Sequence, residues 1–324
     1  MKAAIVGADG VEIADVPVPK PAPNEVLVKV RAAGLNRADV GVASGQAHGR
    51  SGGSGTVIGL EFSGEVVEIG AEVENVRPGD RVMCSGAQAW AEYAVADRGR
   101  VSPIPANNMT YAQAATLPVA LQTMHDAIMT NGRMQAGEAV LIQGASSGVG
   151  LMGLQIAKAM GARLVIGTST NPQRRARLTE FGADLALDSS DPSWVEQTLA
   201  ATGGAGVDLI VDQICGPLAT QNMQATKILG RIVNVGRLGG TTGPFDFNLH
   251  ALRRIQYIGV TFRTRTIDEV REITRRMTAD LQGAIDAGDL SLPIDREFPL
   301  DAAAEALAHM RANRHFGKIV LNVD

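Results

Sequence analysis

The segment after residue 139 has the residue types and spacing of a phosphate-binding turn. An apolar run, Val140-Leu141-Ile142, leads into a turn of small residues and then into a helical pattern over residues 151–160. Within the turn, three residues occupy the glycine positions of the dinucleotide-binding fingerprint, although only the last is glycine: Ala145, Ser147 and Gly150. Small side chains let the backbone approach a pyrophosphate, and the first N–H groups of a helix donate to it. We therefore expect a dinucleotide site at Ala145, Ser146, Ser147, Gly148, Val149 and Gly150; the alternative is an ordinary glycine-rich turn between a strand and a helix.

The end of the next expected strand, residues 163–168, indicates which dinucleotide fits. A carboxylate at this point would accept hydrogen bonds from the ribose of NAD, but residues 169–175, Ser-Thr-Asn-Pro-Gln-Arg-Arg, contain no acid. The hydroxyls of Ser169 and Thr170, together with Arg174, are suited to a 2′-phosphate. We therefore expect NADPH rather than NADH. The alternative is that Arg174 and Arg175 are solvated charges on a helix face.

Strand-like and helical runs alternate around this turn. The expected strands cover residues 139–143, 163–168, 185–188, 207–212, 231–235 and 255–262. Proline at the first helical position marks three helix starts, at Asn171-Pro172, Asp191-Pro192 and Gly216-Pro217. This alternation predicts an α/β fold with a doubly wound, parallel, six-stranded sheet covered by helices on both faces.

The two ends of the chain follow other patterns. The first third is rich in strands, expected at residues 25–33, 57–69 and 81–83. Thr110 and Gln113 form a capping-box pattern that opens the helical section. In the tail, Thr266 and Glu269 are expected to cap a long helix that runs to Ala287 and is ended by Gly288. A helix over 301–312 and a strand over 318–323 follow. The tail has too little core of its own, so we expect residues 1–118 and 260–324 to form one domain and residues 119–259 an inserted nucleotide-binding domain.

Composition excludes several classes of partner. The net charge of −4 gives no general attraction to nucleic acid or anionic lipid, and no export signal or membrane span is expected. Two cysteines, Cys84 and Cys215, cannot build a disulfide framework or a four-thiolate zinc site. We expect a cytoplasmic protein with a small-molecule substrate, and with neither nucleic acid nor membrane as partner.

A series of segments in one order resembles the zinc-independent quinone oxidoreductases of the medium-chain dehydrogenase/reductase superfamily. Besides the glycine turn, the segments cover residues 32–39, 59–64, 78–82, 259–263 and 317–321. The resemblance implies a GroES-like, β-rich catalytic domain plus a Rossmann domain, with cofactor and substrate in the cleft between them. It also implies a homodimer.

The zinc-containing relatives differ at two positions. They have a cysteine where this chain has Asn36 and a histidine where it has Leu60, just before Glu61. Because a catalytic zinc needs about three protein ligands, we expect no metal. Glu61 is then expected to be a buried, hydrogen-bonded structural carboxylate.

The resemblance also implies residues around the cofactor. These are Thr123, Gly236, Leu238, Val260, Phe262 and Lys318; those near the nicotinamide have an alternative role in packing between domains. The substrate loop departs from the family pattern, since Gly45-Gln46-Ala47-His48 replaces Gly-x-Tyr-Pro. His48 is a candidate hydrogen-bond donor in place of the missing tyrosine, or is simply solvated. The family often has a tyrosine that helps bind the adenosine phosphate. Its position falls near Ser189, where this chain has no tyrosine.

The function expected from these residues is transfer of a hydride from NADPH to a quinone or a similar conjugated carbonyl compound. Asn36 is the candidate catalytic residue, because a neutral amide donates to a substrate oxygen without a metal; its alternative role is to hold the local turn. Two other functions remain open. One is reduction of the C=C bond of an enone or 2-alkenal, and the other is a low-turnover NADPH sensor or crystallin-like protein.

Overall fold

The structure is a computed structural model that describes residues 1–46 and 52–323. The chain divides into two compact units. Unit 1 comprises Met1–Val119 and Phe262–Asp324, and unit 2 comprises Ala120–Thr261. Each unit has its own sheet and its own apolar core, so each is described by itself.

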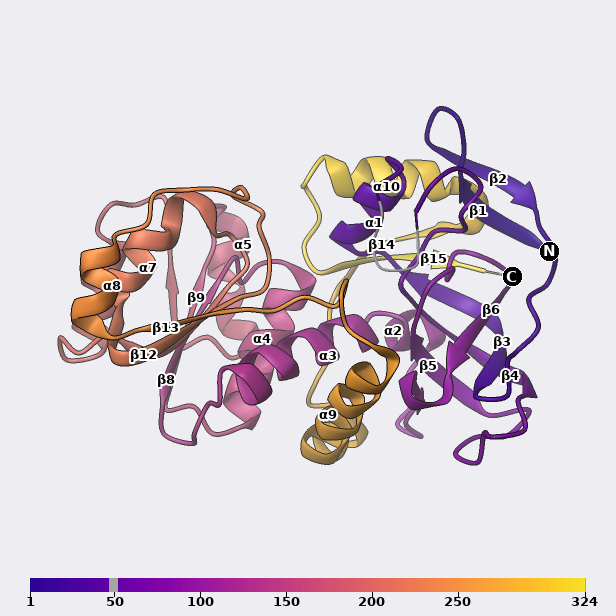
Figure 1. The fold of residues 1–324 in the computed structure, drawn as a ribbon, viewed down its shortest axis with the longest axis horizontal. Helices are drawn as coiled ribbons and strands as arrows, with labels where there is room; N and C mark the ends of the chain where they lie inside the picture. Colours follow the sequence, from indigo (N-terminus) through magenta and orange to yellow (C-terminus); the bar gives the residue numbers. More distant parts are fainter. Residues whose placement is uncertain (47–51, 324) are drawn as a thin grey trace. The chain divides into compact units, whose positions relative to one another are not determined.

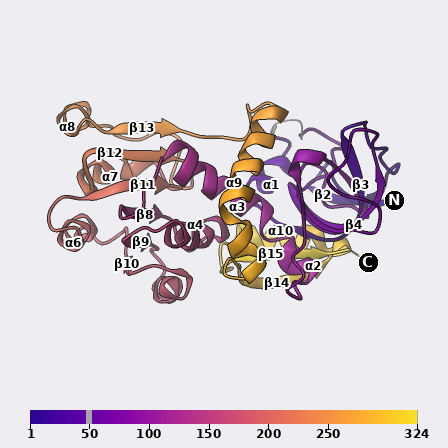
Figure 2. The same cartoon turned by 90° about the horizontal axis from the view of Figure 1, so that it is seen from below.

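Unit 2 contains a sheet of six parallel strands. In chain order these are β8 (Ala139–Gln143), β9 (Leu164–Thr168), β10 (Leu185–Leu187), β11 (Val207–Asp212), β12 (Thr226–Asn234) and β13 (Gln256–Gly259). Their order across the sheet is β10-β9-β8-β11-β12-β13, as Figure 2 shows, and every pairing is parallel. This confirms the expected doubly wound α/β fold. The last strand is shorter than expected because β13 pairs with β12 only from Gln256 to Gly259.

Helices and short helical turns precede and connect the strands of unit 2. They are α3 (Pro118–His125), which starts at the boundary of the unit, η2 (Asp126–Asn131), α4 (Gly148–Ala159), α5 (Pro172–Ala176), η3 (Leu178–Phe181), α6 (Trp194–Ala201), η4 (Gly216–Leu218), α7 (Ala219–Ala225) and α8 (Phe247–Arg253). Helix α4 packs against β8 and β9, and α7 and α8 pack against β12. Apolar side chains under these helices, Trp194 among them, form the core of the unit.

Of the three expected proline helix starts, the one at Pro172 is confirmed, the one at Pro217 begins a 3-10 turn instead of an α-helix, and the one at Pro192 is wrong. The Asn171 side chain accepts a hydrogen bond from the Arg174 N–H, so α5 begins at Pro172. Asp191 instead accepts hydrogen bonds from Ser193, which makes a local turn, and α6 begins only at Trp194. Gly216-Pro217 lies in the short 3-10 turn η4, and α7 begins after it.

Unit 1 is built on a seven-stranded sheet. Its strands are β3 (Glu25–Gly34), β4 (Glu61–Ile69), β5 (Arg81–Ser85), β6 (Tyr93–Asp97), β7 (Val101–Pro103), β14 (Ile294–Pro299) and β15 (Lys318–Asn322), while β1 (Lys2–Val6) and β2 (Val11–Asp15) form a separate pair. The C-terminal strand β15, yellow in Figure 1, pairs antiparallel with β3. The two ends of the sequence therefore share one sheet.

The helices of unit 1 are α1 (Arg37–Val42), α2 (Tyr111–Ala114), α9 (Ile267–Ala287) and α10 (Ala303–Arg311), with single 3-10 turns at η1 (Arg98–Arg100) and η5 (Leu300–Ala302). Both expected capping boxes are confirmed: Thr110 with Gln113 opens α2, and Thr266 with Glu269 opens α9. Helix α9 ends where Gly288 adopts a left-handed conformation.

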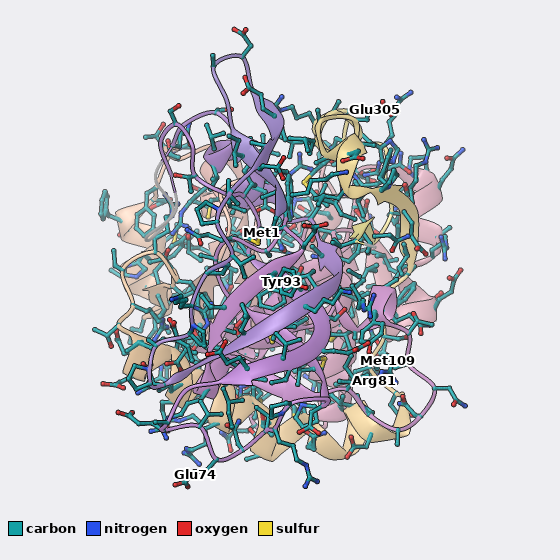
Figure 3. The ribbon with its side chains drawn as sticks, turned by 90° about the vertical axis from the view of Figure 1, so that its right-hand side faces the viewer. Met1, Glu74, Arg81, Tyr93, Met109 and Glu305 are labelled. Atoms are coloured by element: carbon teal, nitrogen blue, oxygen red, sulfur yellow. The ribbon has the colours of Figure 1, made fainter. Side chains whose placement is uncertain are left out.

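Side chains on the surface of unit 1 tie its turns to the sheet. Arg81, at the start of β5, lies beside Met109 in Figure 3 and donates to its carbonyl at 2.8 Å. The same guanidinium lies 4.6 Å from the centre of the Tyr111 ring. Over residues 1–46 and 52–323, no helix is long and apolar enough to cross a membrane.

Candidate functional site

The glycine turn of unit 2 connects β8 to α4. The Ser147 hydroxyl accepts a hydrogen bond from the Gly150 N–H at 3.0 Å, which caps the helix and fixes its start at Gly148. A side chain at position 150 would place its Cβ 2.7 Å from the Cα of Ala145, so only glycine allows the helix to pack this closely on the turn. The N–H groups of Gly148 and Val149 have no helical carbonyl before them. The turn is therefore built to donate hydrogen bonds to a phosphate group.

A buried polar network lies at the ends of the strands next to this turn. Gln143, the last residue of β8, accepts a hydrogen bond from the Thr168 hydroxyl at 2.6 Å and donates to Asn222 at 2.8 Å. Asn222 in turn donates to Asp212, the last residue of β11, at 2.9 Å. All four side chains are fully buried. A polar residue at the end of each of two apolar strands, Gln143 in β8 and Asp212 in β11, is the only signal of this network in the sequence.

Gln213 links the turn to the neighbouring strand. Its Nε2 donates to the carbonyls of Gln143 and Gly144, both at 3.2 Å, and its Oε1 accepts from the Ser147 hydroxyl at 3.1 Å. Strands β8 and β11 are the two at which the order of the sheet reverses, which is the usual position of a ligand in an open α/β sheet. The sequence-predicted phosphate site therefore lies at the topological switch point.

Asp212 and Cys215 are buried side chains at the end of β11 and in the turn after it. Asp212 accepts hydrogen bonds from the Ile214 and Cys215 N–H groups, both at 2.9 Å, and so holds the turn that follows β11. Burial raises the pKa of the Asp212 carboxyl above its ordinary value despite these bonds. Burial and the nearby Asp212 raise the pKa of the Cys215 thiol to about 12. This thiol stays protonated and unreactive near neutral pH.

The residues expected to bind the adenosine end lie close to the turn. The Ser169 hydroxyl donates to the Ser146 hydroxyl at 3.0 Å, which brings the end of β9 against the glycine turn. Thr170 is exposed and Arg174 is half-buried. Arg175 is not simply a solvated charge, because it donates to the Ser169 carbonyl and to Asp188, both at 2.8 Å. An acid therefore does lie near this site, although it comes from the end of β10 rather than of β9.

Three of the residues expected near the nicotinamide lie at the same edge of the sheet. The N–H groups of Gly236 and Leu238 donate to the carbonyls of Asp212 and Gln213, and the Val260 N–H donates to the Asn234 carbonyl. Thr123 is half-buried on α3, and its neighbour Met124 lies against Gly153 of α4. Phe262, by contrast, is the first residue of the second segment of unit 1.

Unit 1 contains a compact polar cluster around Asn36, which precedes helix α1. The Asn36 side chain donates to Glu61 Oε1 at 2.8 Å and accepts from Lys318 Nζ at 3.1 Å. Lys318 also donates to the Leu35 carbonyl at 2.8 Å and forms an ion pair with Glu61. Glu61 further accepts from the Val119 N–H at 2.9 Å. The prediction of Glu61 as a buried, hydrogen-bonded carboxylate is confirmed.

Lys318, which the resemblance assigns to the cofactor, is only 4% exposed. An ammonium group has three hydrogens, and the contacts to Leu35, Asn36 and Glu61 use all three. We therefore place Lys318 in the cluster around Asn36 instead. His48 lies outside the described residues, as does Ala47.

Asp39, in helix α1, is the fourth side chain of the cluster around Asn36. One carboxylate oxygen accepts from the Asn36 N–H at 2.7 Å, and the other has no hydrogen-bond partner among the residues described. Desolvation by complete burial raises the pKa of Asp39 to about 7, against opposing effects of that hydrogen bond and of the nearby Lys318. Asp39 is therefore a carboxyl group that is partly protonated near neutral pH.

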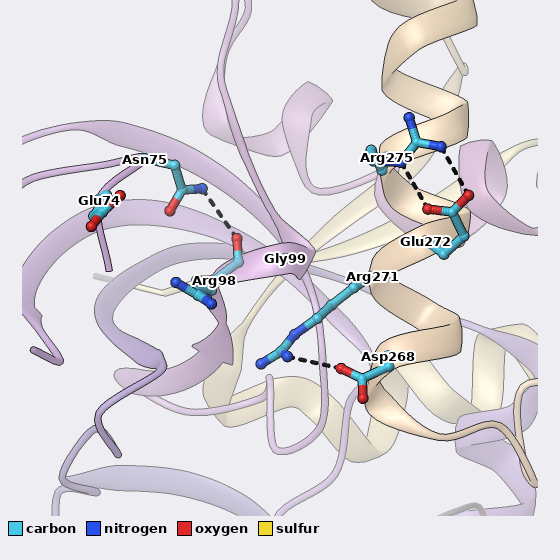
Figure 4. A pocket seen from close by; sticks show the side chains of 8 residues that line it. All are labelled: Glu74, Asn75, Arg98, Gly99, Asp268, Arg271, Glu272 and Arg275. Carbon is cyan, nitrogen blue, oxygen red and sulfur yellow. Dashed lines mark hydrogen bonds and ion pairs between the residues drawn. The ribbon is translucent and has the colours of Figure 1, made fainter. Parts of the chain in front are cut away.

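A separate polar hollow in unit 1 lies between the turn at Glu74 and the first turns of α9 (Figure 4). Its arginines already have partners: Arg271 pairs with Asp97 and Asp268, Arg275 pairs with Glu272, and Arg98 donates to the Glu72 carbonyl. Positive and negative charges are balanced around it, and none of the residues expected to bind cofactor or substrate lines it. We assign it no function.

The chain matches two described families in order along its length. Residues 22–106 match the alcohol dehydrogenase GroES-like domain, and residues 148–279 match the zinc-binding dehydrogenase family. A mouse quinone oxidoreductase is 30% identical over 298 residues, which cover 90% of this chain and 87% of that protein. The chain belongs to the medium-chain dehydrogenase/reductase superfamily, within its quinone oxidoreductase-like group. The expected family is thereby confirmed, and so is a GroES-like domain combined with a Rossmann domain.

Other medium-chain dehydrogenases/reductases extend this comparison. A structure described as an NAD-dependent alcohol dehydrogenase has a TM-score of 0.86 and 29% identity, with complete coverage of both chains. A mycocerosic acid synthase-like polyketide synthase of Mycolicibacterium smegmatis is 29% identical over 308 residues, but the chain spans only 14% of that protein. The protein is thus an oxidoreductase of this superfamily with a fold that binds NAD or NADP.

Proposed function

We propose that the protein is an NADPH-dependent quinone oxidoreductase that works without zinc. The observation that carries this proposal is the Asn36 amide, which is fixed by Glu61 and Lys318 at the position where zinc-containing relatives have a cysteine. A neutral amide with a fixed orientation donates a hydrogen bond to a carbonyl oxygen on which negative charge develops. Unit 1 would then carry the substrate and unit 2 the cofactor.

The glycine turn supports binding of a dinucleotide. Gly150 leaves no room for a Cβ, and the free N–H groups of the first turn of α4 suit a pyrophosphate. Bound NADPH would supply the hydride. The chain would contribute binding by residues 145–150, contacts to the adenosine end from Ser169, Thr170 and Arg174, and walls around the nicotinamide from Thr123, Gly236, Leu238, Val260 and Phe262.

The preference for NADPH over NADH rests on the end of β9. Ser169 lies there beside Ser146, and Arg174 follows in the first turn of α5. Hydroxyl groups and a guanidinium are suitable partners for a 2′-phosphate. We expect Arg174→Ala to raise KM for NADPH without changing KM for NADH; an equal effect on both would contradict this assignment.

The donor set around Asn36 does not suit a catalytic zinc. Asn36 contributes an amide, Leu60 an apolar side chain, and both oxygens of Glu61 already accept hydrogen bonds from protein groups. Oxidation of NADPH would therefore proceed unchanged after treatment with a chelator. His48 remains a candidate second donor, since it lies in the segment that faces substrate in the family.

The experiment that tests the function follows NADPH oxidation with a quinone and with a 2-alkenal in parallel. Faster turnover of the quinone supports the proposal. Preference for the 2-alkenal would instead assign the chain as a C=C reductase, because the same donor and hydride serve an enone. Tight binding of NADPH without turnover of either compound would favour a sensor or crystallin-like role.

We also propose a homodimer formed through unit 2. Strand β13 is at the edge of its sheet. The neighbouring helix α8 exposes Phe247 by 77% and Leu252 by 68%, and large exposed apolar side chains near a free strand edge are suited to a second copy. Light scattering would show a monomer if this is wrong. For its location we propose the cytoplasm, because Cys84 and Cys215 are both unpaired thiols.

A further inference from the structure

A positive charge lies directly behind the Asn36 amide. The Lys318 ammonium donates to Asn36 Oδ1 at 3.1 Å and is paired with Glu61, and these three side chains are 4%, 8% and 0% exposed. A buried ammonium is tolerated when it is paired and hydrogen-bonded. Here its three hydrogens all have acceptors, since the third goes to the Leu35 carbonyl. The charge is therefore held at a defined place in the interior of unit 1.

The contacts on the two ends of the amide fix its orientation. Lys318 donates to the oxygen of Asn36, while the nitrogen donates to Glu61 at 2.8 Å. A cation on the oxygen draws electron density away from the nitrogen and makes its N–H groups stronger donors, because successive hydrogen bonds polarise one another. One of the two Nδ2 hydrogens is used by Glu61, and the second is the donor in the proposed function.

We propose that Lys318 is a positioning residue that fixes and polarises the Asn36 amide, so that its second N–H better stabilises the negative charge that develops on the substrate oxygen. This inference rests on the proposed function. The ammonium group of Lys318 is then a buried cation whose effect on the substrate is exerted through the Asn36 amide. Lys318 itself touches neither substrate nor cofactor.

A double-mutant cycle tests the proposal in the full-length enzyme. We expect Lys318→Met to lower kcat with a quinone by about tenfold, with Kd for NADPH unchanged in a fluorescence titration. In an Asn36→Ala background the same change is expected to lower kcat no further. Independent, additive losses in the cycle would overturn the proposal, and so would weaker binding of NADPH to Lys318→Met.

Two variants separate this effect from a general loss of stability. Lys318→Met leaves Glu61 buried without its cation, so the double variant Lys318→Met/Glu61→Gln supplies a neutral pair. It is expected to melt closer to the wild type while its kcat stays low. Lys227→Met is the matched control, because Lys227 is paired with the nearly buried Asp208 in unit 2. We expect normal kcat from this control.

A second readout does not depend on turnover. In protein labelled with ¹⁵N-asparagine, the side-chain amide signal of Asn36 is identified by its loss in Asn36→Ala. We expect its proton resonances to lie downfield in the wild type and to move upfield in Lys318→Met. If the wild type turns over neither quinone nor 2-alkenal, the proposed function fails and this shift still tests the polarisation. An unchanged chemical shift would refute it.

Discussion

Lys318 and Glu61 form a buried ion pair that joins the first residue of β15 to the first residue of β4, 257 positions apart in the sequence. Removal of one partner from such a pair leaves an uncompensated charge in the interior. We expect Glu61→Ala to lower the free energy of unfolding by about 3–5 kcal/mol in urea titrations. The exposed pair Lys2–Asp301 offers the control, and Asp301→Ala should cost far less. Equal losses in the two variants would show that burial does not matter here.

Gly150→Ala tests the packing of the phosphate turn. The new Cβ would lie 2.7 Å from the Cα of Ala145 and from the Gly144 carbonyl, so the backbone of the turn must move. We expect NADPH affinity to fall at least about tenfold in a fluorescence titration. Gly283→Ala is the matched control, since a Cβ on the exposed face of α9 meets nothing within 4 Å. It should raise stability by roughly 0.5–1 kcal/mol and leave NADPH binding intact.

Asp188 limits the positive charge available near the adenosine end. It pairs with Arg175 at 2.8 Å, and the hydrogen bonds from Ser190, together with this arginine, lower the pKa of Asp188. We expect Asp188→Asn to increase the ratio of kcat/KM for NADPH over NADH by roughly fivefold, because no carboxylate then offsets the positive charge of Arg175. Asp191→Asn serves as control, since Asp191 bonds Ser193 instead. A ratio that stays constant in Asp188→Asn would contradict this role.

Asp39 should give stability a specific pH dependence. Its folded pKa of about 7 lies above its ordinary value of 3.8, so between these values the folded protein keeps a proton that the unfolded chain has released. The contribution of Asp39 is therefore full below about pH 4, falls as pH rises to about 7, and is then constant. Asp39→Asn removes it. We expect the variant to lose less stability than the wild type between pH 5 and pH 8, by an amount on the order of 2 kcal/mol. Parallel pH profiles of urea unfolding would be the contrary result.

Local patterns predicted much of the fold. The bounds of β8 and β11 follow from short apolar runs between turns, and helix α9 follows from a capping box at Thr266 and a glycine at its end. The start of α6 was mispredicted because Asp191 and Ser193 form a turn that competes with a helix start.

The polar contacts of the candidate site could be predicted only in part. The fingerprint at residues 145–150 and the unusual Asn36 are visible in the sequence. The contacts of Lys318 with Glu61, and of Gln143 with Asn222, join residues far apart in the chain, so no periodicity or spacing indicates them. The resemblance assigned Lys318 to the cofactor. In the structure Lys318 is the first residue of β15, and its ammonium group donates to the Asn36 side chain.

The central claim is that a quinone is reduced by NADPH with an amide, rather than a metal, as the hydrogen-bonding partner of its oxygen. The most direct test is the initial rate of NADPH oxidation with 1,4-benzoquinone in the presence of a strong chelator, with wild type and Asn36→Ala side by side. We predict a wild-type rate that the chelator does not change and a kcat for Asn36→Ala that is lower by about 100-fold. Loss of wild-type turnover in the chelator, or equal rates for the two proteins, would contradict the account.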